Sequence, residues 1–94
     1  MPYFSIVMPC HNAERYLWDA LATVVAQSFQ DWELIAVNDG STDGTEAILQ
    51  EAYSADRRVR VIQQNNQGPG AARNAGVSAA TGKVLERIER QLNH

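Results

Sequence analysis

Three short apolar runs alternate along this chain with three segments of helical periodicity. The runs lie at residues 4–8, 33–37 and 59–62, and runs of this length are typical of strands buried on both faces of a sheet. After the first run, Leu17, Leu21 and Val24 recur at helical spacing. Strands that alternate with helices pair in parallel through right-handed crossovers. The pattern predicts an α/β fold: a three-layer, mostly parallel βαβαβα half of a doubly wound sheet.

The sequence also indicates where the predicted helices begin and end, and how closely the third can pack. Asn12 is a favourable N-cap for the first helix, and the second should run to about Ser54. The third helix carries small residues at helical spacing, which would let its backbone approach a neighbour closely. These residues are Ala72, Ala75, Gly76 and Ala79.

The last twelve residues break the alternation of strands and helices. A chain of 94 residues is one domain, which we assign to residues 1–82. In residues 83–94 the apolar side chains fall on one helical face, so this tail is predicted to be an amphipathic helix. Its apolar face needs cover, from its own sheet or from a second copy of the chain.

Composition excludes several classes of protein. The net charge is −3, and the one basic cluster, at Arg57, Arg58 and Arg60, is too small for a nucleic-acid footprint. Cys10 is the only cysteine, so no internal disulfide can form, which fits a cytoplasmic location. No apolar stretch is long enough to span a bilayer. We expect a soluble protein that binds no nucleic acid.

Asp39 is the first candidate for a functional residue. It lies just past an apolar run, inside the segment NDGSTDGT at residues 38–45. In open α/β sheets, ligands bind in the crevice outside the carboxyl ends of the strands. A carboxylate at that place can accept hydrogen bonds from a base or a ribose.

Other candidates should lie at the same edge of the sheet. Residues 9–14 join the first strand to the first helix, where His11 could stack on a base, contact a phosphate or be an ordinary loop residue. The helix dipole explains Glu14 in the first helical turn. The same dipole disfavours Arg73, in the first turn of the third helix. Arg73 could pair with a diphosphate or with Asp39, or lie on the surface.

Two common phosphate-binding motifs are absent. The sequence Gly68-Pro69-Gly70 could open a dinucleotide fingerprint, but Arg73 stands where the third glycine is required. The loop also follows the third strand and not the first. No Gly-Lys-Ser/Thr sequence occurs, which excludes a P-loop.

Four blocks in order resemble the family-two glycosyltransferases, inverting enzymes with a GT-A, nucleotide-diphospho-sugar transferase-like fold. They are SIVMPCHN at residues 5–12, QSFQDWEL at 27–34, NDGSTDGT at 38–45 and NQGPGAARNAG at 66–76. The resemblance implies a nucleotide-sugar donor, usually a UDP sugar. By the same resemblance, Asp39 would bind the uracil, Arg73 would lie near the nucleotide, and the base and ribose would be lined by Pro9, His11 and Glu14.

The chain departs from this family at three places. His11 replaces a usual tyrosine, and Asn38 replaces the first of two aspartates. After residues 80–82 the family enters a fourth strand that ends in Asp-x-Asp, which holds Mn²⁺ or Mg²⁺, and this motif is missing here. We therefore expect a truncated protein that binds the donor but is inactive alone, with no catalytic residue and no metal bound by this chain.

Loss of the fourth strand would leave the first strand with an open edge. Such edges invite pairing with another chain. We expect a homodimer through this edge or through the C-terminal helix. The alternative to a glycosyltransferase fragment is a non-catalytic module that binds a nucleotide or self-associates.

Overall fold

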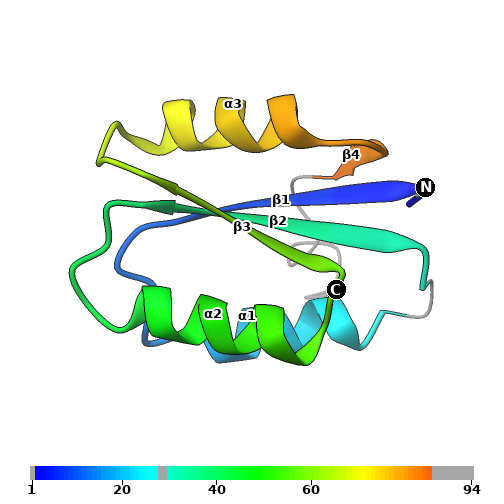
Figure 1. Cartoon of the computed structure of the whole chain (residues 1–94), viewed down its shortest axis with the longest axis horizontal. Helices are drawn as coiled ribbons and strands as arrows, with labels where there is room; N and C mark the ends of the chain where they lie inside the picture. Colours follow the sequence, from blue (N-terminus) through cyan, green and yellow to red (C-terminus); the bar gives the residue numbers. More distant parts are fainter. Residues whose placement is uncertain (1, 28–29, 86–94) are drawn as a thin grey trace.

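The protein forms a four-stranded parallel sheet with helices on both faces (Figure 1). The structure is a computed structural model that describes residues 2–27 and 30–85. The strands follow the order β3-β2-β1-β4 across the sheet. They are β1 (Phe4–Cys10), β2 (Trp32–Asp39), β3 (Val59–Gln64) and β4 (Lys83–Leu85).

Three helices complete the layers. Helix α3 (Pro69–Ala79) covers one face of the sheet, and α1 (Leu17–Val25) and α2 (Thr45–Ala55) lie together on the other (Figure 1). The predicted three-layer α/β architecture with parallel strands is therefore confirmed, and the pairs β1–β2, β2–β3 and β1–β4 are all parallel.

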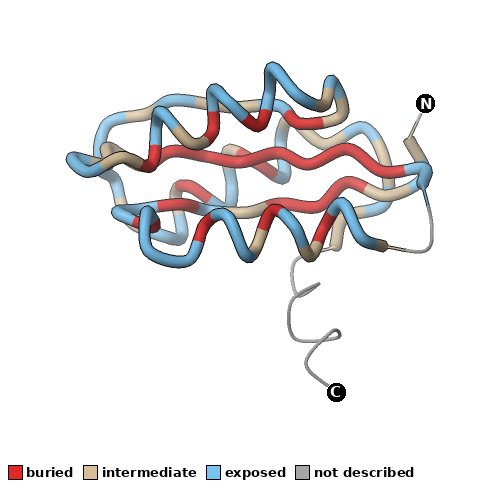
Figure 2. The backbone as a smooth tube through the Cα atoms, turned by 90° about the horizontal axis from the view of Figure 1, so that it is seen from below, coloured by how far each residue is buried: buried red, intermediate tan, exposed pale blue. Residues whose placement is uncertain are grey.

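Strand β2 is the centre of the core. All eight of its residues are buried, and its tube runs through the middle of the molecule in Figure 2. Because successive side chains of a strand point to opposite faces, Leu34 and Ala36 pack on the α1 and α2 side. Ile35 and Val37 pack against α3. Because helices cover both faces of the sheet, the side chains of β2 are buried on both sides, which explains its continuous apolar run.

Helix α3 lies close to the sheet because small residues face it. Ala72 and Gly76 are buried at this contact, as their spacing predicted. A β-carbon added at Gly76 would overlap the side chain of Val7 in β1. The absence of a side chain at Gly76 therefore sets how near α3 can approach.

This contact predicts different effects for two glycine substitutions in one helix. Gly76→Ala should be less stable than Gly70→Ala by about 1–3 kcal/mol, the usual cost of overpacking a core. Gly70 is the matched control, because it has open space around it and the comparison cancels most of the helix propensity of alanine. Urea unfolding of both variants measures the difference. Equal stabilities would show that the β1–α3 contact yields without cost.

The predicted helical tail is wrong at its start. Lys83–Leu85 form strand β4, which pairs in parallel with Phe4–Ile6 of β1. A short apolar run fits both the helical and the strand periodicity. Here the strand forms because the edge of β1 offers backbone groups with which it can pair. The edge of β1 expected to be open is thus covered along Phe4–Ile6, which weakens that argument for a homodimer. The rest of the predicted tail, 86–94, lies outside the described residues.

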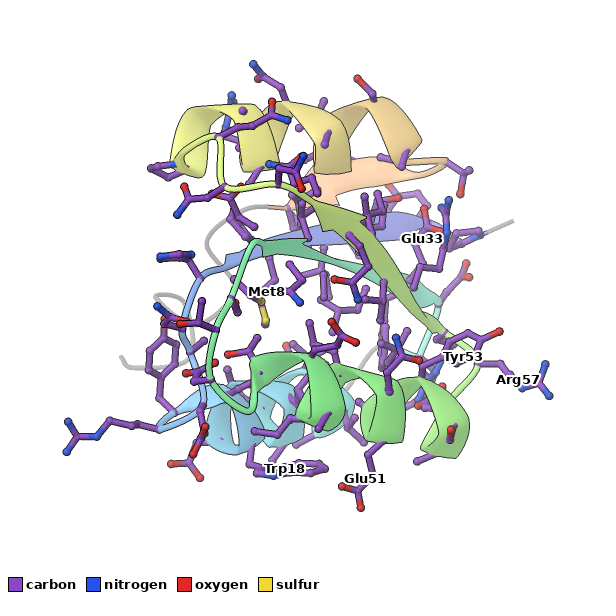
Figure 3. All side chains as sticks on the ribbon, turned by 60° about the vertical axis from the view of Figure 1, so that its left-hand side comes forward. Met8, Trp18, Glu33, Glu51, Tyr53 and Arg57 are labelled. Carbon is purple, nitrogen blue, oxygen red and sulfur yellow. The ribbon has the colours of Figure 1, made fainter. Side chains whose placement is uncertain are left out.

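A buried carboxylate joins the approach to β4 to the sheet. Glu33, near the start of β2, is labelled in Figure 3. Its Oε2 accepts hydrogen bonds from Ser5 Oγ at 2.6 Å and from both the N–H and the hydroxyl of Thr81 at 2.8 Å. Its Oε1 accepts one from Arg60 Nη1 at 3.0 Å. Ser5 Oγ in turn accepts from the N–H of Gly82 at 2.7 Å.

These bonds determine the charge state of Glu33. Burial alone would raise the pKa of its carboxyl, but the hydrogen bonds from Ser5, Thr81 and Arg60 outweigh burial and lower the pKa to about 2. The carboxylate is therefore ionised at neutral pH, and it binds Thr81, which lies 48 positions after Glu33 in the sequence.

Candidate functional site

The candidate site is a pocket of about 330 Å³ at the carboxyl ends of the strands. Parallel topology brings the ends of β1 and β2 and the loop after β3 together at this edge, the usual ligand-binding place in open α/β sheets. The pocket is lined by Pro9, Cys10, His11, Tyr16, Asp39, Asn66, Gly68, Pro69 and Ala72.

Asp39, the last residue of β2, is a buried carboxylate at this pocket. Its Oδ1 accepts hydrogen bonds from Gln64 Nε2 at 2.9 Å and from the N–H of Gln67 at 2.8 Å. Its Oδ2 accepts from the N–H of Gly68 at 3.0 Å. The bond from Gln64, followed by the backbone bonds, holds the pKa of Asp39 below its usual range despite burial. The pocket thus contains an ionised acceptor in a defined orientation.

His11 is placed by the backbone of the same aspartate. Its Nδ1 lies 2.8 Å from the carbonyl oxygen of Asp39, and since a carbonyl can only accept, Nδ1 must carry the proton. In the neutral ring, Nε2 is then the acceptor, and it lies 3.5 Å from Nδ2 of Asn66. The partner atoms assign this tautomer.

Cys10 has no part in the chemistry of this pocket. Its thiol is buried and lies 3.4 Å from the carbonyl oxygen of Met8. Burial raises the pKa of the thiol to about 12. A thiol that stays protonated is a poor nucleophile, so Cys10 is a packing residue in the pocket wall.

Glu14 lies elsewhere than the resemblance implied. It does not line the pocket; its carboxylate accepts a hydrogen bond from the N–H of Gly44, and its own N–H donates to Asp43 at 3.2 Å. Glu14 therefore ties the loop after β1 to the loop after β2. A β-carbon at Gly44 would crowd the Glu14 carboxylate, so a larger residue there would require this flexible side chain to shift.

Asn12 belongs to the same junction, and its predicted role as a helix cap is wrong. Helix α1 begins at Leu17 with Tyr16 as its N-cap. Asn12 has a φ of 49°, a conformation that asparagine tolerates better than most residues. Its Oδ1 accepts from the N–H of Thr42 at 2.8 Å. The two loops are thus fixed to each other beside the pocket.

Arg73 is exposed on α3. It is the fifth residue of that helix, one turn later than the sequence predicted, and it is not among the residues that line the pocket. Of the five predicted site residues, the structure brings together Pro9, His11 and Asp39, and it places Glu14 and Arg73 outside the lining.

Sequence reasoning missed several residues of the pocket. Tyr16 is exposed at its rim, and Asn66 and Gly68 reach it from the loop after β3. A usable signal existed for the loop, because parallel pairing puts the end of the third strand at the same edge as Asp39. The same signal places Gln64 at this edge, but the sequence did not show that its side chain donates to Asp39.

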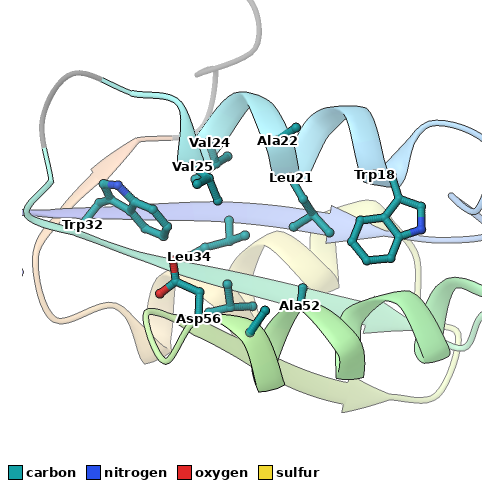
Figure 4. A pocket seen from close by; sticks show the side chains of 11 residues that line it. Trp18, Leu21, Ala22, Val24, Val25, Trp32, Leu34, Ala52 and Asp56 are labelled. Atoms are coloured by element: carbon teal, nitrogen blue, oxygen red, sulfur yellow. The ribbon is translucent and has the colours of Figure 1, made fainter.

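A second hollow lies between α1 and α2 and differs in character. It holds about 260 Å³ and, apart from Asp56, its lining residues are apolar (Figure 4). Trp32, from β2, forms part of its wall, and the guanidinium of Arg58 lies 3.8 Å from the centre of the Trp32 ring. It has no cluster of polar groups comparable to that at Asp39.

Residues 2–27 and 30–85 offer neither a cluster of metal ligands nor a helix that could span a membrane. This part of the chain contains no group of three or more His, Cys, Asp or Glu side chains placed to hold a metal ion. Its helices are also too short or too polar to cross a bilayer.

Known proteins with related sequences share most of this chain. The family model "Glycosyl transferase family 2" matches residues 5–87. An uncharacterized glycosyltransferase of Haemophilus influenzae is 39% identical over 99% of this chain and 42% of its own length. The putative teichuronic acid biosynthesis glycosyltransferase TuaG of Bacillus subtilis is 40% identical over 94% of this chain and 35% of its own length.

Solved structures agree with this result. Residues 1–349 of TarS from S. aureus, also solved in complex with UDP, superpose with a TM-score of 0.81 and 34% identity. That match covers 89% of this chain and 26% of TarS 1–349. The mannosyltransferase PcManGT of Pyrobaculum calidifontis, solved with GDP-Man and Mn²⁺, has a TM-score of 0.76 at 20% identity, which supports the fold alone.

The chain spans less than half the length of each of these relatives. The matched part nevertheless includes the described sheet except for Phe4, and the whole pocket at its carboxyl edge. The sequence, the fold and the comparisons agree that this chain belongs to glycosyl transferase family 2.

Proposed function

We propose that this chain is the donor-binding part of a glycosyltransferase and that its pocket binds the nucleoside diphosphate of a UDP sugar. The observation that carries the proposal is the ionised, oriented carboxylate of Asp39 in a pocket at the carboxyl edge of the sheet. TarS, a relative of the same fold, has been solved in complex with UDP, which supports this choice of nucleotide.

The proposal assigns a role to each predicted site residue. Asp39 accepts a hydrogen bond from the N–H of the uracil ring, and Pro9 and His11 pack against the base. Glu14 acts indirectly, by joining the two loops. Arg73, an exposed cation on α3, attracts the diphosphate.

The divalent cation expected in the longer enzymes does not fit the residues described here. No metal-holding group of side chains occurs within 2–27 and 30–85, so we assign no step to a metal. The proposal for this chain is limited to donor binding, and the transfer of sugar to an acceptor is left to the longer enzymes.

Titration with UDP tests the proposal, by calorimetry or by NMR and with and without Mn²⁺. We expect the chain to bind UDP, and Asp39→Ala to weaken binding at least about tenfold, the usual loss for a hydrogen bond to a charged group. Binding should not require the metal. The matched control is Glu51→Gln, which removes one negative charge from the exposed side of α2 (Figure 3).

Two outcomes would contradict the proposal. The first is an absence of binding at millimolar UDP by the unaltered chain. The second is an equal affinity of the Asp39→Ala and Glu51→Gln variants. If UDP does not bind and light scattering shows dimers, the alternative of a self-associating module would be favoured.

A further inference from the structure

Gln64 lies directly opposite Asp39 in the sheet. It is the last residue of β3, and the register of the parallel pair β2–β3 aligns the two residues. Its side-chain Nε2 donates to Asp39 Oδ1 at 2.9 Å. A neutral amide that donates to a carboxylate stabilises the charged form without competing for the proton. The contact therefore favours the ionised form of Asp39 at the pocket.

Within the part of the chain that the structure describes, three donors reach the Asp39 carboxylate, and they come from two different parts of the fold. The N–H groups of Gln67 and Gly68 belong to the loop after β3 and lie 2.8 and 3.0 Å from the carboxylate oxygens. Gln64 is the side-chain donor of the three, and it comes from strand β3. The hydrogen bond from Gln64 thus orients the Asp39 carboxylate. The carboxylate in turn accepts hydrogen bonds from the loop that lines the pocket.

We propose that Gln64 is a positioning residue for the nucleotide site, which orients the Asp39 carboxylate and through it the Gln67–Gly68 loop. The proposal rests on the proposed function in one respect, that Asp39 contacts the ligand. Gln64 itself is not among the residues that line the pocket. Its effect on a ligand is therefore indirect.

The neighbouring residue supplies a matched control. Gln63 also lies opposite its partner in register, and its Oε1 accepts from Asn38 Nδ2 at 2.8 Å. Because successive strand residues point to opposite faces, this bond lies on the other side of the sheet from Asp39. Gln63→Met and Gln64→Met each remove one cross-strand hydrogen bond between the same two strands. Only the second removes a bond to Asp39.

The first measurement needs no ligand. NMR titration of the Asp39 carboxyl in the unaltered chain should give a pKa below the usual range for aspartate. Gln64→Met should raise that pKa toward the ordinary range of aspartate, because the carboxylate loses a hydrogen bond from a neutral donor. It should also speed hydrogen exchange at the Gln67 and Gly68 amides. Gln63→Met should change neither. Equal effects of the two variants, or none from Gln64→Met, would overturn the proposal.

A second variant guards against misfolding of the first. Gln64→Glu keeps the size of the side chain but places a like charge against Asp39, so the pKa of Asp39 should rise further. An unchanged Asp39 titration in a folded Gln64→Glu variant would also overturn the proposal. Circular dichroism establishes that each variant is folded.

Affinity for UDP separates this proposal from the proposed function. If the chain binds UDP, Gln64→Met should weaken binding about tenfold, and the loss of binding on acidification should begin at higher pH. Gln63→Met should bind as the unaltered chain does. If the unaltered chain binds no UDP, the proposed function fails. The Asp39 titration and the amide exchange then still decide whether Gln64 positions the carboxylate.

Discussion

Glu33→Ala is expected to reduce the free energy of unfolding by about 3–5 kcal/mol, because several hydrogen bonds to one buried carboxylate, each usually contributing about 1.5–3 kcal/mol, are lost together. The carboxylate accepts hydrogen bonds from Ser5, Thr81 and Arg60, and Ser5 is fully buried. Alanine would leave these donors without their acceptor and open a cavity in β2. Urea unfolding followed by tryptophan fluorescence measures the loss, because Trp32 is buried next to Glu33 in the same strand.

The matched control for this prediction is Glu51→Ala. Glu51 is exposed on α2 (Figure 3), and substitutions at such positions usually change stability by less than about 0.5 kcal/mol. A loss below about 1 kcal/mol for Glu33→Ala would mean that water satisfies the donors instead. The network around Glu33 would then be a weak contact.

Acid should destabilise the protein through the same carboxyl. The pKa of Glu33 is about 2 in the folded chain against an ordinary 4.5, so the unfolded chain takes up the proton more readily. The stabilisation is complete above about pH 4.5 and is lost as the pH falls toward 2. Such a difference in pKa corresponds to about 3 kcal/mol.

A pH series of urea unfolding tests this expectation. Glu33→Gln is the control, since it keeps the shape of the side chain but cannot titrate. The unaltered chain should lose about 3 kcal/mol more than this variant between about pH 7 and about pH 2. The pKa values of Asp39, Asp43 and Asp56 are also lowered, and their contributions are common to both proteins. Parallel pH curves would show that Glu33 does not titrate differently in the folded state.

Much of the fold could be predicted because its signals are local. Apolar runs of strand length marked β1, β2 and β3, and helical spacing marked the segments between them. Strand β4 was missed because Lys83–Leu85 are three residues long, too few to show a period of two. Their conformation depends on hydrogen bonds to β1, a segment about 80 positions earlier in the chain.

The candidate site was predictable only to the level of the sheet edge. Parallel topology alone puts Pro9, His11 and Asp39 at the same edge, and there the structure has them. The positions of Glu14 and Arg73 depend on the path of two loops and the starting residue of α3, which local preferences do not specify. The contact between Gln64 and Asp39 follows from strand register, and register is a property of the paired sheet.

The sequence by itself determined the order of the first three strands and the three helices, their parallel pairing and the end of the sheet where the candidate pocket lies, because apolar periodicity is a local property and alternating strands and helices pair in parallel. Only the tertiary structure decided what the buried carboxylates do. Glu33 reads in the sequence as the polar start of a strand. In the fold it meets Ser5, Arg60 and Thr81, between 27 and 48 positions away. Burial and partner geometry set the charge state of such a group, and both exist only when distant segments come together.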